Sequence, residues 1–208
     1  EMFRIRLAAW IAALLLFQAA AALAALEYKI VTASERGTYI QIGRNLPQFV
    51  APAADIELQA LPSAGSAKNV KRLRFESGVK FALVQSDVYQ AFLDQAAGGN
   101  VDATAMIRPL RVILPLYNEE IYFLVRADSE LNFVHDIRSA KINVGELGSG
   151  TALTTTTLYR LMFSAPIPQA NATFLSNEEA LVKLITDKSV DVLAVIGAQL
   201  GKLLVDMK

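Results

Sequence analysis

Four short turns in this sequence combine small or polar side chains with unpaired backbone N–H groups, which can bind a carboxylate or a phosphate. Each turn follows an apolar run that predicts a strand, and each precedes residues with helical periodicity. The free amides and the dipole at the start of a helix attract anions. The turns are Ser34-Glu35-Arg36-Gly37-Thr38-Tyr39, Pro62-Ser63-Ala64-Gly65-Ser66, Gln85-Ser86-Asp87 and Glu146-Leu147-Gly148-Ser149-Gly150-Thr151.

These turns supply most of the candidate ligand-binding residues. A single turn of this kind is explained more simply by ordinary helix capping. Four of them, spread over both halves of the chain, favour a small acidic molecule held between the halves. Arg36 could pair with a carboxylate or remain solvated, and Tyr117 could stack on the ligand or pack at a hinge. The candidates are Arg36, Thr38, Tyr39, Ser66, Gln85, Ser86, Tyr117, Gly148, Ser149, Gly150 and Thr151.

The residues that most enzymes and metal sites require are scarce. The chain has no cysteine and one histidine, His135, so a zinc site or a Ser-His-Asp triad would have to use that histidine. The turn at 148–151 lacks the lysine and the glycine spacing of a phosphate-binding P-loop. Ser149 has no evident base to activate it. We therefore expect a binding protein that is not an enzyme and that uses no metal or cofactor.

The overall charge argues against nucleic acid as a partner. The chain carries 20 basic and 20 acidic side chains, with a formal net charge of zero. A protein that binds nucleic acid needs a basic face to contact the phosphates. A small-molecule ligand is therefore the expected partner.

The turns must be positioned by strands and helices that alternate along the chain. This alternation predicts an α/β fold with a mainly parallel sheet, whose ligands bind beyond the carboxyl ends of the strands. Gly98, Gly99 and Asn100 predict a loop, and Ser66 and Ser86 are expected to cap helices. Strands are expected at 27–33, 56–61, 79–85, 111–117, 120–126, 141–145 and 190–196, and helices at 37–50, 66–75, from 86 onward, 151–163, 177–187 and 197–206.

The N-terminus has the features of a secretory signal. Arg4 and Arg6 precede an apolar run, and Ala22-Leu23-Ala24 fits a signal-peptidase site. We expect residues 1–24 to be a cleaved signal peptide that directs the protein to the periplasm. The alternative is a retained membrane helix over 7–26, which is long enough to span a bilayer. The absence of cysteine excludes a lipid-anchoring cysteine near the cleavage site.

The four turns, in their order and spacing, resemble those of the TAXI-type solute receptors of tripartite (TRAP) transporters, which are periplasmic binding proteins. The resemblance runs from about Tyr28 to the C-terminus. The segments that carry it are Arg36-Gly37-Thr38-Tyr39, Ala64-Gly65-Ser66-Ala67-Lys68-Asn69-Val70, Gln85-Ser86-Asp87-Val88 and Val144-Gly145-Glu146-Leu147-Gly148-Ser149-Gly150-Thr151.

The resemblance implies a two-lobed, type II periplasmic-binding-protein fold that closes on its ligand about a hinge. It implies a receptor that delivers an organic anion or amino acid, such as a glutamate-like carboxylate, to TRAP-type permease subunits in the membrane. It also implies that Thr38, Tyr39, Ser66, Gln85, Ser86, Ser149, Gly150 and Thr151 line the cleft. Glu35 and Arg36 stand where these receptors usually have small residues.

The expected organisation is lobe I over 25–117, a hinge strand over 118–126 and lobe II over 127–208. Receptors of this type normally continue beyond lobe II and return to lobe I, so we expect the C-terminal part of the fold to be missing. The competing function is a ligand-sensing input domain of a membrane-anchored signalling protein. A retained N-terminal helix would favour that alternative.

Overall fold

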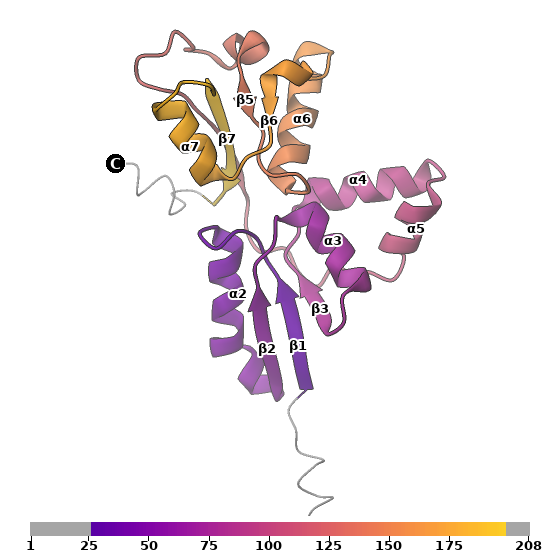
Figure 1. Cartoon of the computed structure of the whole chain (residues 1–208). Coiled ribbons are helices and arrows are strands. Elements are labelled where there is room, and N and C mark those ends of the chain that lie inside the picture. Colours follow the sequence, from indigo (N-terminus) through magenta and orange to yellow (C-terminus); the bar gives the residue numbers. More distant parts are fainter. Residues whose placement is uncertain (1–25, 199–208) are drawn as a thin grey trace, which may run out of the picture.

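The computed structural model describes residues 26–198. The predicted signal peptide (1–24) lies outside these residues, as does the predicted C-terminal helix (197–206) apart from its first two residues. Gly197, where that helix was expected to begin, is instead the last residue of a strand. Two sheets with their helices form two lobes, one above the other in Figure 1.

Lobe I is built on a three-stranded parallel sheet in the order β2-β1-β3. Its buried core includes Ile30 and Val31 in the central strand and a cluster of Val70, Val88 and Phe92 between the helices. The carboxyl ends of its strands point toward lobe II (Figure 1). Its elements are β1 (Leu26–Val31), α2 (Thr38–Phe49), η1 (Ala51–Ala54), β2 (Ile56–Leu61), α3 (Ser66–Phe75), β3 (Val79–Ala82), α4 (Ser86–Ala97) and α5 (Val101–Ile107).

Lobe II is built on a four-stranded mixed sheet in the order β4-β7-β5-β6, in which only β4 is antiparallel to its neighbour. Val192, Leu193 and Ala194 of β7 are fully buried, as expected for a central strand covered on both faces. Its elements are β4 (Glu120–Leu124), η2 (Val134–Ser139), β5 (Ile142–Asn143), α6 (Gly150–Phe163), η3 (Gln169–Asn171), β6 (Ala172–Thr173), α7 (Asn177–Ile185) and β7 (Val192–Gly197).

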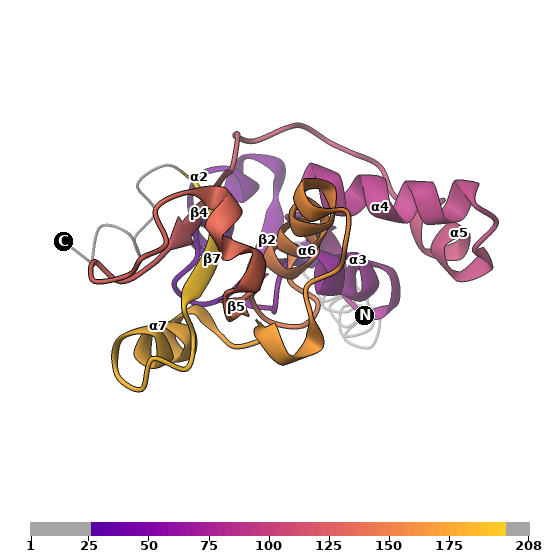
Figure 2. The same ribbon diagram turned by 90° about the horizontal axis from the view of Figure 1, so that it is seen from above.

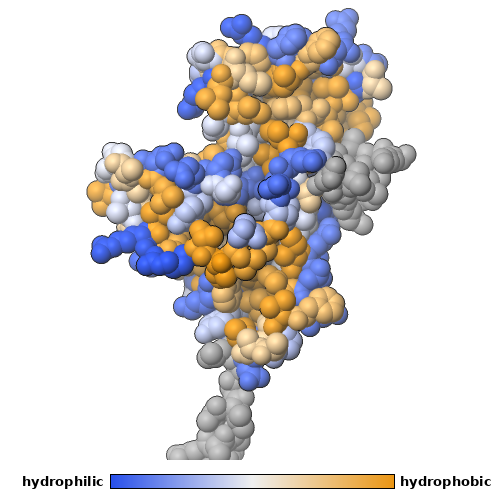
Figure 3. All heavy atoms as spheres, turned by 180° about the vertical axis from the view of Figure 1, so that it is seen from behind, coloured by the Kyte–Doolittle hydropathy of each residue, from blue (hydrophilic) through white to orange (hydrophobic). Residues whose placement is uncertain are grey.

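The strand predicted over 111–117 is wrong. Residues 109–119 form an irregular segment that leads from α5 to β4, seen from above in Figure 2. Its apolar residues Val112, Ile113 and Leu114 are largely exposed. Alternating apolar residues become a strand only where a neighbouring strand offers hydrogen bonds, and no described strand pairs with this segment. Figure 3 shows further apolar side chains gathered on the rear face of lobe I.

Three local predictions in lobe I are corrected at the helix ends. Helix α5 replaces part of an expected loop, because the Asn100 side chain accepts a hydrogen bond from the Ala103 N–H at 2.9 Å and caps a new helix. Ser66 and Ser86 are first residues of their helices and not caps; Gly65 and Gln85 occupy the cap positions. The side chain of Ser66 is thereby free to face Gln85. The remaining strands and helices predicted within the described residues are present, β2 and α3 with the predicted bounds and the others with shifted ends. A capping box joins Ser176 and Glu179 at the start of α7.

None of the helices between residues 26 and 198 combines the length and the apolar character that crossing a membrane requires.

Candidate functional site

A cavity of about 160 Å³ lies between the two lobes. Its wall is formed almost entirely by the turns that follow β1, β2 and β3 in lobe I and β5 and β6 in lobe II, together with the end of β7. The carboxyl ends of both sheets therefore meet at one place, where ligands of open α/β sheets bind. The volume suits a small solute and is well below that of a site for a drug-sized ligand.

Four helices begin at this wall, with Thr38, Ser66, Gly150 and Asn177 as their first residues. The starts of α6 and α7 are capped by the side chains of Ser149 and Ser176. The starts of α2 and α3 carry no side-chain cap among the described residues. The first backbone N–H groups of a helix have no partner within it, and in α3 the third of these, from Lys68, donates to the Gly148 carbonyl. The N–H groups at the very start of each helix remain as donors to the cavity.

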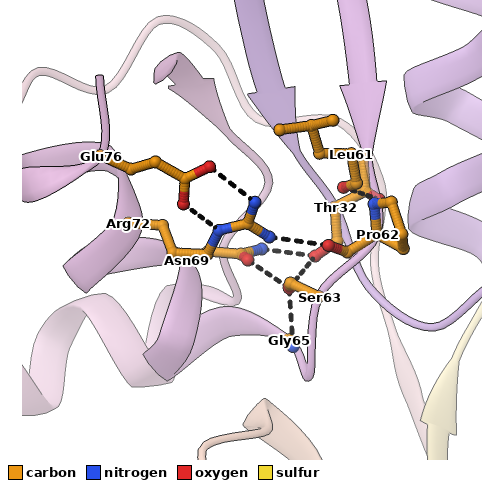
Figure 4. Close-up of polar contacts among 8 residues, drawn as sticks. All are labelled: Thr32, Leu61, Pro62, Ser63, Gly65, Asn69, Arg72 and Glu76. Carbon is orange, nitrogen blue, oxygen red and sulfur yellow. Dashed lines mark hydrogen bonds and ion pairs between the residues drawn. The ribbon is translucent and has the colours of Figure 1, made fainter. Parts of the chain in front are cut away.

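A buried asparagine fixes the turn that precedes α3. Asn69, which is fully buried, donates one hydrogen bond to the Thr32 carbonyl (Figure 4). It donates another of 2.8 Å to the Leu83 carbonyl. The Ser63 hydroxyl donates to the Thr32 carbonyl and accepts from the Gly65 N–H at 2.9 Å. The ends of β1 and β3 and the turn after β2 are thus joined. This network holds the start of α3 against the cavity.

The lobes touch directly along one side of the cavity. The Lys68 N–H donates a 3.0 Å hydrogen bond to the Gly148 carbonyl. Gly65 has φ of +118°, which favours glycine, and a Cβ there would lie 3.3 Å from the Cα of Ser149. A Cβ on Gly150 would lie 1.2 Å from Oε1 of Gln85. Glycine at 65 and 150 is therefore what allows the two lobes to close on each other.

A glutamate held by two tyrosines forms another part of the site. The Tyr39 hydroxyl donates a 3.0 Å hydrogen bond to Oε2 of Glu119, and the Tyr117 hydroxyl lies 3.4 Å from Oε1. The two rings meet edge to face, with their centroids 6.3 Å apart. Burial raises the pKa of Glu119, and hydrogen bonds from Tyr39, Gln85 and Tyr117 partly offset that rise. Burial, followed by the charge of Glu119, raises the pKa of both tyrosines, so both stay neutral donors.

The charged side chains in the wall are all acidic. They are Glu119, Glu146 and Glu178, and no described lysine, arginine or histidine lines the cavity. Arg36 lies 3.9 Å from Glu178, with a side chain that is 70% exposed. Its guanidinium therefore stands at the rim, beside a glutamate.

The structure brings together seven of the eleven candidate residues in the cavity wall: Thr38, Tyr39, Ser66, Gln85, Ser149, Gly150 and Thr151. The other four lie beside it. Arg36 is at the rim, Tyr117 packs behind Tyr39, and the Gly148 carbonyl joins the lobes. Ser86 follows Gln85 at the start of α4 and is not part of the wall.

The wall also contains residues that the sequence did not indicate as site residues. The most informative are Glu119 and Glu178, together with Ser176 and the end of β7 at Gly197. Ser176 caps the start of α7 after β6 and so forms a fifth turn of the same kind as the four that the sequence indicates. Glu119 stands among polar residues between two expected strands, and no local pattern marks it.

Within residues 26–198 no group of three or more histidines, aspartates or glutamates is arranged to hold a metal ion. His135 is on the surface, 3.3 Å from Asp136, whose carboxylate caps the short helix η2 by accepting from the Phe133 N–H at 2.8 Å. A more open hollow of about 610 Å³ lies between α6 and residues 166–174. Among the described residues no α-helix begins in its lining, and its charged lining is the side chain of Arg160.

The sequence matches the model of the NMT1-like family over residues 30–201. A structure of a protein from Bordetella bronchiseptica is similar to 87% of this chain, with a TM-score of 0.53 and 12% identity. The chain spans about half (54%) of that protein's length. A structure from Actinomyces odontolyticus has a TM-score of 0.44 at 10% identity, covering 83% of this chain and 70% of its own. The fold is that of the two-lobed periplasmic binding proteins.

Proposed function

The chain belongs to the NMT1-like family, and we propose that it is an extracytoplasmic receptor that binds a small solute between its lobes. The observation that carries the proposal is the cavity at the meeting of the two sheets. Turns from both lobes form its wall, so one small molecule would contact both lobes at once. A receptor of this design needs no catalytic group.

The proposed ligand is an organic anion or an amino acid, with a carboxylate as the shared group. The uncapped starts of α2 and α3 support this choice, because their N–H groups and dipoles favour a negative charge. The proposed binding residues are the seven candidates in the wall, with Arg36, Tyr117, Ser86 and Gly148 in supporting positions. The resemblance to TAXI-type receptors extends the proposal to delivery of a glutamate-like carboxylate to a TRAP-type permease from the periplasm, after removal of the signal peptide.

The proposed mechanism is closure of the lobes about residues 118–126, which contain β4. In an open form the ligand would touch one lobe, and in the closed form it touches both. A ligand stabilises the state with which it makes more favourable contacts, so it favours closure. Lobe I would extend over 25–117 and lobe II over 127–208. The hydrogen bond between Lys68 and Gly148 describes the closed arrangement.

Binding without turnover is part of the proposal. The Ser149 hydroxyl, the most obvious nucleophile in the wall, accepts a hydrogen bond from the Ala152 N–H at 3.0 Å and caps α6. His135, the one histidine of the chain, has a 74% exposed side chain and is not in the wall. No described histidine is therefore placed to activate that serine.

A thermal-shift screen of the protein against small carboxylates and amino acids tests the proposal. A ligand present at 100 times its dissociation constant stabilises the folded state by about 2.7 kcal/mol, which raises Tm by several degrees. Gly150→Leu is the matched variant, because its side chain would occupy the space of Gln85. We expect a selective shift in the wild type that Gly150→Leu loses. A shift that survives this substitution would place the ligand elsewhere.

A further inference from the structure

The charge of the cavity wall restricts the ligand more narrowly than the helix starts do. Three glutamates line the cavity, and no basic side chain of residues 26–198 does. A ligand with only negative charge would meet these carboxylates without a compensating cation. A ligand with a cationic group as well as a carboxylate would be complementary both to the glutamates and to the helix starts.

Glu119 is the carboxylate best placed to bind such a cationic group. Its two oxygens each accept one tyrosine hydroxyl, from Tyr39 and from Tyr117. A carboxylate can accept about four hydrogen bonds, two on each oxygen, and Gln85 supplies a third, so Glu119 retains capacity for one further donor. The tyrosines fix the orientation of the carboxylate without neutralising it. Because Glu119 itself lines the cavity, this remaining acceptor site is available to a ligand.

The other two glutamates are less suited to this role. Glu178 is partnered by Arg36 at 3.9 Å, with 44% of its side chain exposed. Glu146 has no hydrogen bond that holds its carboxylate among the described residues, so ordering it would cost conformational entropy on binding. Glu119 is already ordered and half-buried, and an ionic hydrogen bond gains strength where water is excluded.

We propose that the solute is an amino acid whose protonated amine binds the Glu119 carboxylate, while its carboxylate binds at the starts of α2 and α3. This inference rests on the proposed function and identifies the ligand class and a residue that determines specificity. Tyr39 and Tyr117 are positioning residues that act through Glu119. The contact between the lobes at Gly150 also brings the start of α6 to this cavity, so lobe II contributes to the same binding site.

The experiment compares each amino acid with the same molecule lacking its amine. Calorimetry with the full chain would use L-glutamate against glutarate, L-alanine against propionate, and L-leucine against 4-methylpentanoate. We expect the affinity of the best-binding amino acid to exceed that of its deaminated partner by about tenfold or more, which is the discrimination that a charge-assisted hydrogen bond supplies. Glu119→Gln should abolish most of this affinity ratio, because it weakens binding of the amino acid and leaves binding of the deaminated acid unchanged.

Three further glutamine variants make the result specific. Glu146→Gln and Glu178→Gln should change the ratio less than Glu119→Gln does, and Glu57→Gln, an exposed residue of β2, should leave it unchanged. Deaminated acids that bind as tightly as the amino acids would overturn this inference and leave the receptor function intact. A ratio that depends on Glu146 or Glu178 and not on Glu119 would also overturn it. No binding by either class would overturn the proposed function itself.

Discussion

The Tyr39 hydroxyl donates a 3.0 Å hydrogen bond to Glu119, a residue 80 positions later in the chain. Tyr39 lies in the first turn of α2 in lobe I, and Glu119 directly precedes β4 of lobe II. The bond therefore joins the two lobes at the cavity wall, on the element proposed as the hinge. It also holds a carboxylate in place for a ligand. Both consequences can be tested separately.

Tyr39→Phe should weaken binding of the amino-acid ligand by several-fold without preventing folding. The substitution removes one of the hydrogen bonds that stabilise the charged form of Glu119, so the pKa of that carboxyl should rise further. Carbon-detected NMR titration of the glutamate carboxyls would measure the pKa. Tyr28→Phe is the control, since Tyr28 meets Phe81 edge to face and keeps its ring. An unchanged Glu119 titration in Tyr39→Phe would contradict the account.

Binding should weaken as the pH falls through the raised pKa of Glu119. The amine needs the ionised carboxylate, and the loss should begin above the ordinary glutamate value of 4.5. The groups around it are Tyr39 from α2, Tyr117 from its own segment, and Gln85 and Asp87 from α4. Both tyrosines stay neutral in this range because their pKa values are raised. Calorimetry across pH should show a loss that Glu119→Gln removes; the same loss in that variant would contradict the assignment.

Glu119→Gln should stabilise the unliganded protein at alkaline pH. A carboxyl whose pKa is raised in the folded state contributes stability below its unfolded pKa and loses it as the pH rises through the folded pKa. Glu119→Gln removes the charge, so it should raise the free energy of unfolding at high pH. The gain should be less than about 1 kcal/mol because solvent reaches part of the side chain. Urea unfolding would show the difference at about pH 8 and its disappearance near pH 4. If Glu119→Gln instead destabilises the protein at pH 8, the folded state favours the ionised form of Glu119, which contradicts a raised pKa.

Gly150→Ala should weaken ligand binding by about tenfold, because the added methyl group displaces the Gln85 side chain or separates the lobes. A Cβ at this position would be 1.2 Å from Gln85 Oε1. Combining it with Gln85→Ala should cost less than the sum of the two single substitutions, since the clash is then absent. Calorimetry on the four proteins of this cycle would measure the coupling. Strict additivity would show that the two residues do not meet across the lobes.

Asn69→Ala should destabilise the fold by about 1–3 kcal/mol. It removes the donors to the Thr32 and Leu83 carbonyls inside a fully buried network. Asn171→Ala is the matched control, because Asn171 donates one exposed hydrogen bond to the Ser139 carbonyl and should cost under about 1 kcal/mol. Chemical unfolding gives both values. Equal losses of unfolding free energy in the two variants would show that the network at the start of α3 does not contribute to stability.

The alternating strands and helices could be predicted because their signals are local. The bounds of β2 and α3 agree with the prediction, which rested on alternation in β2 and on an expected cap at Ser66 that the structure replaces with Gly65. The same reasoning failed at residues 111–117, where a strand-like pattern has no partner strand. It also missed α5, whose cap at Asn100 lies in a run that predicts a loop. Strand pairing is a tertiary property that periodicity alone does not contain.

The candidate site also contains residues that local sequence signals could predict and residues that they could not. Ser66, Gln85 and Ser149 could be found because they stand at the starts of helices that follow strands. Glu119 could not, because its role depends on Tyr39 reaching it across the lobes. Arg36 was weighed as a carboxylate ligand from its charge, yet its position at the rim beside Glu178 depends on how α7 is placed.

The central claim is that one small solute contacts both lobes in the cavity. NMR with glycine-selective ¹⁵N labelling tests it directly, because the chain has 11 glycines and those at 37, 65, 145, 150 and 197 line the wall. With the best ligand from the thermal screen, we predict simultaneous amide shifts at Gly65 of lobe I and Gly150 of lobe II. Unaltered signals from Gly78 and Gly99, which are not in the wall, serve as the internal reference. Shifts confined to one lobe, or to glycines outside the wall, would contradict the claim.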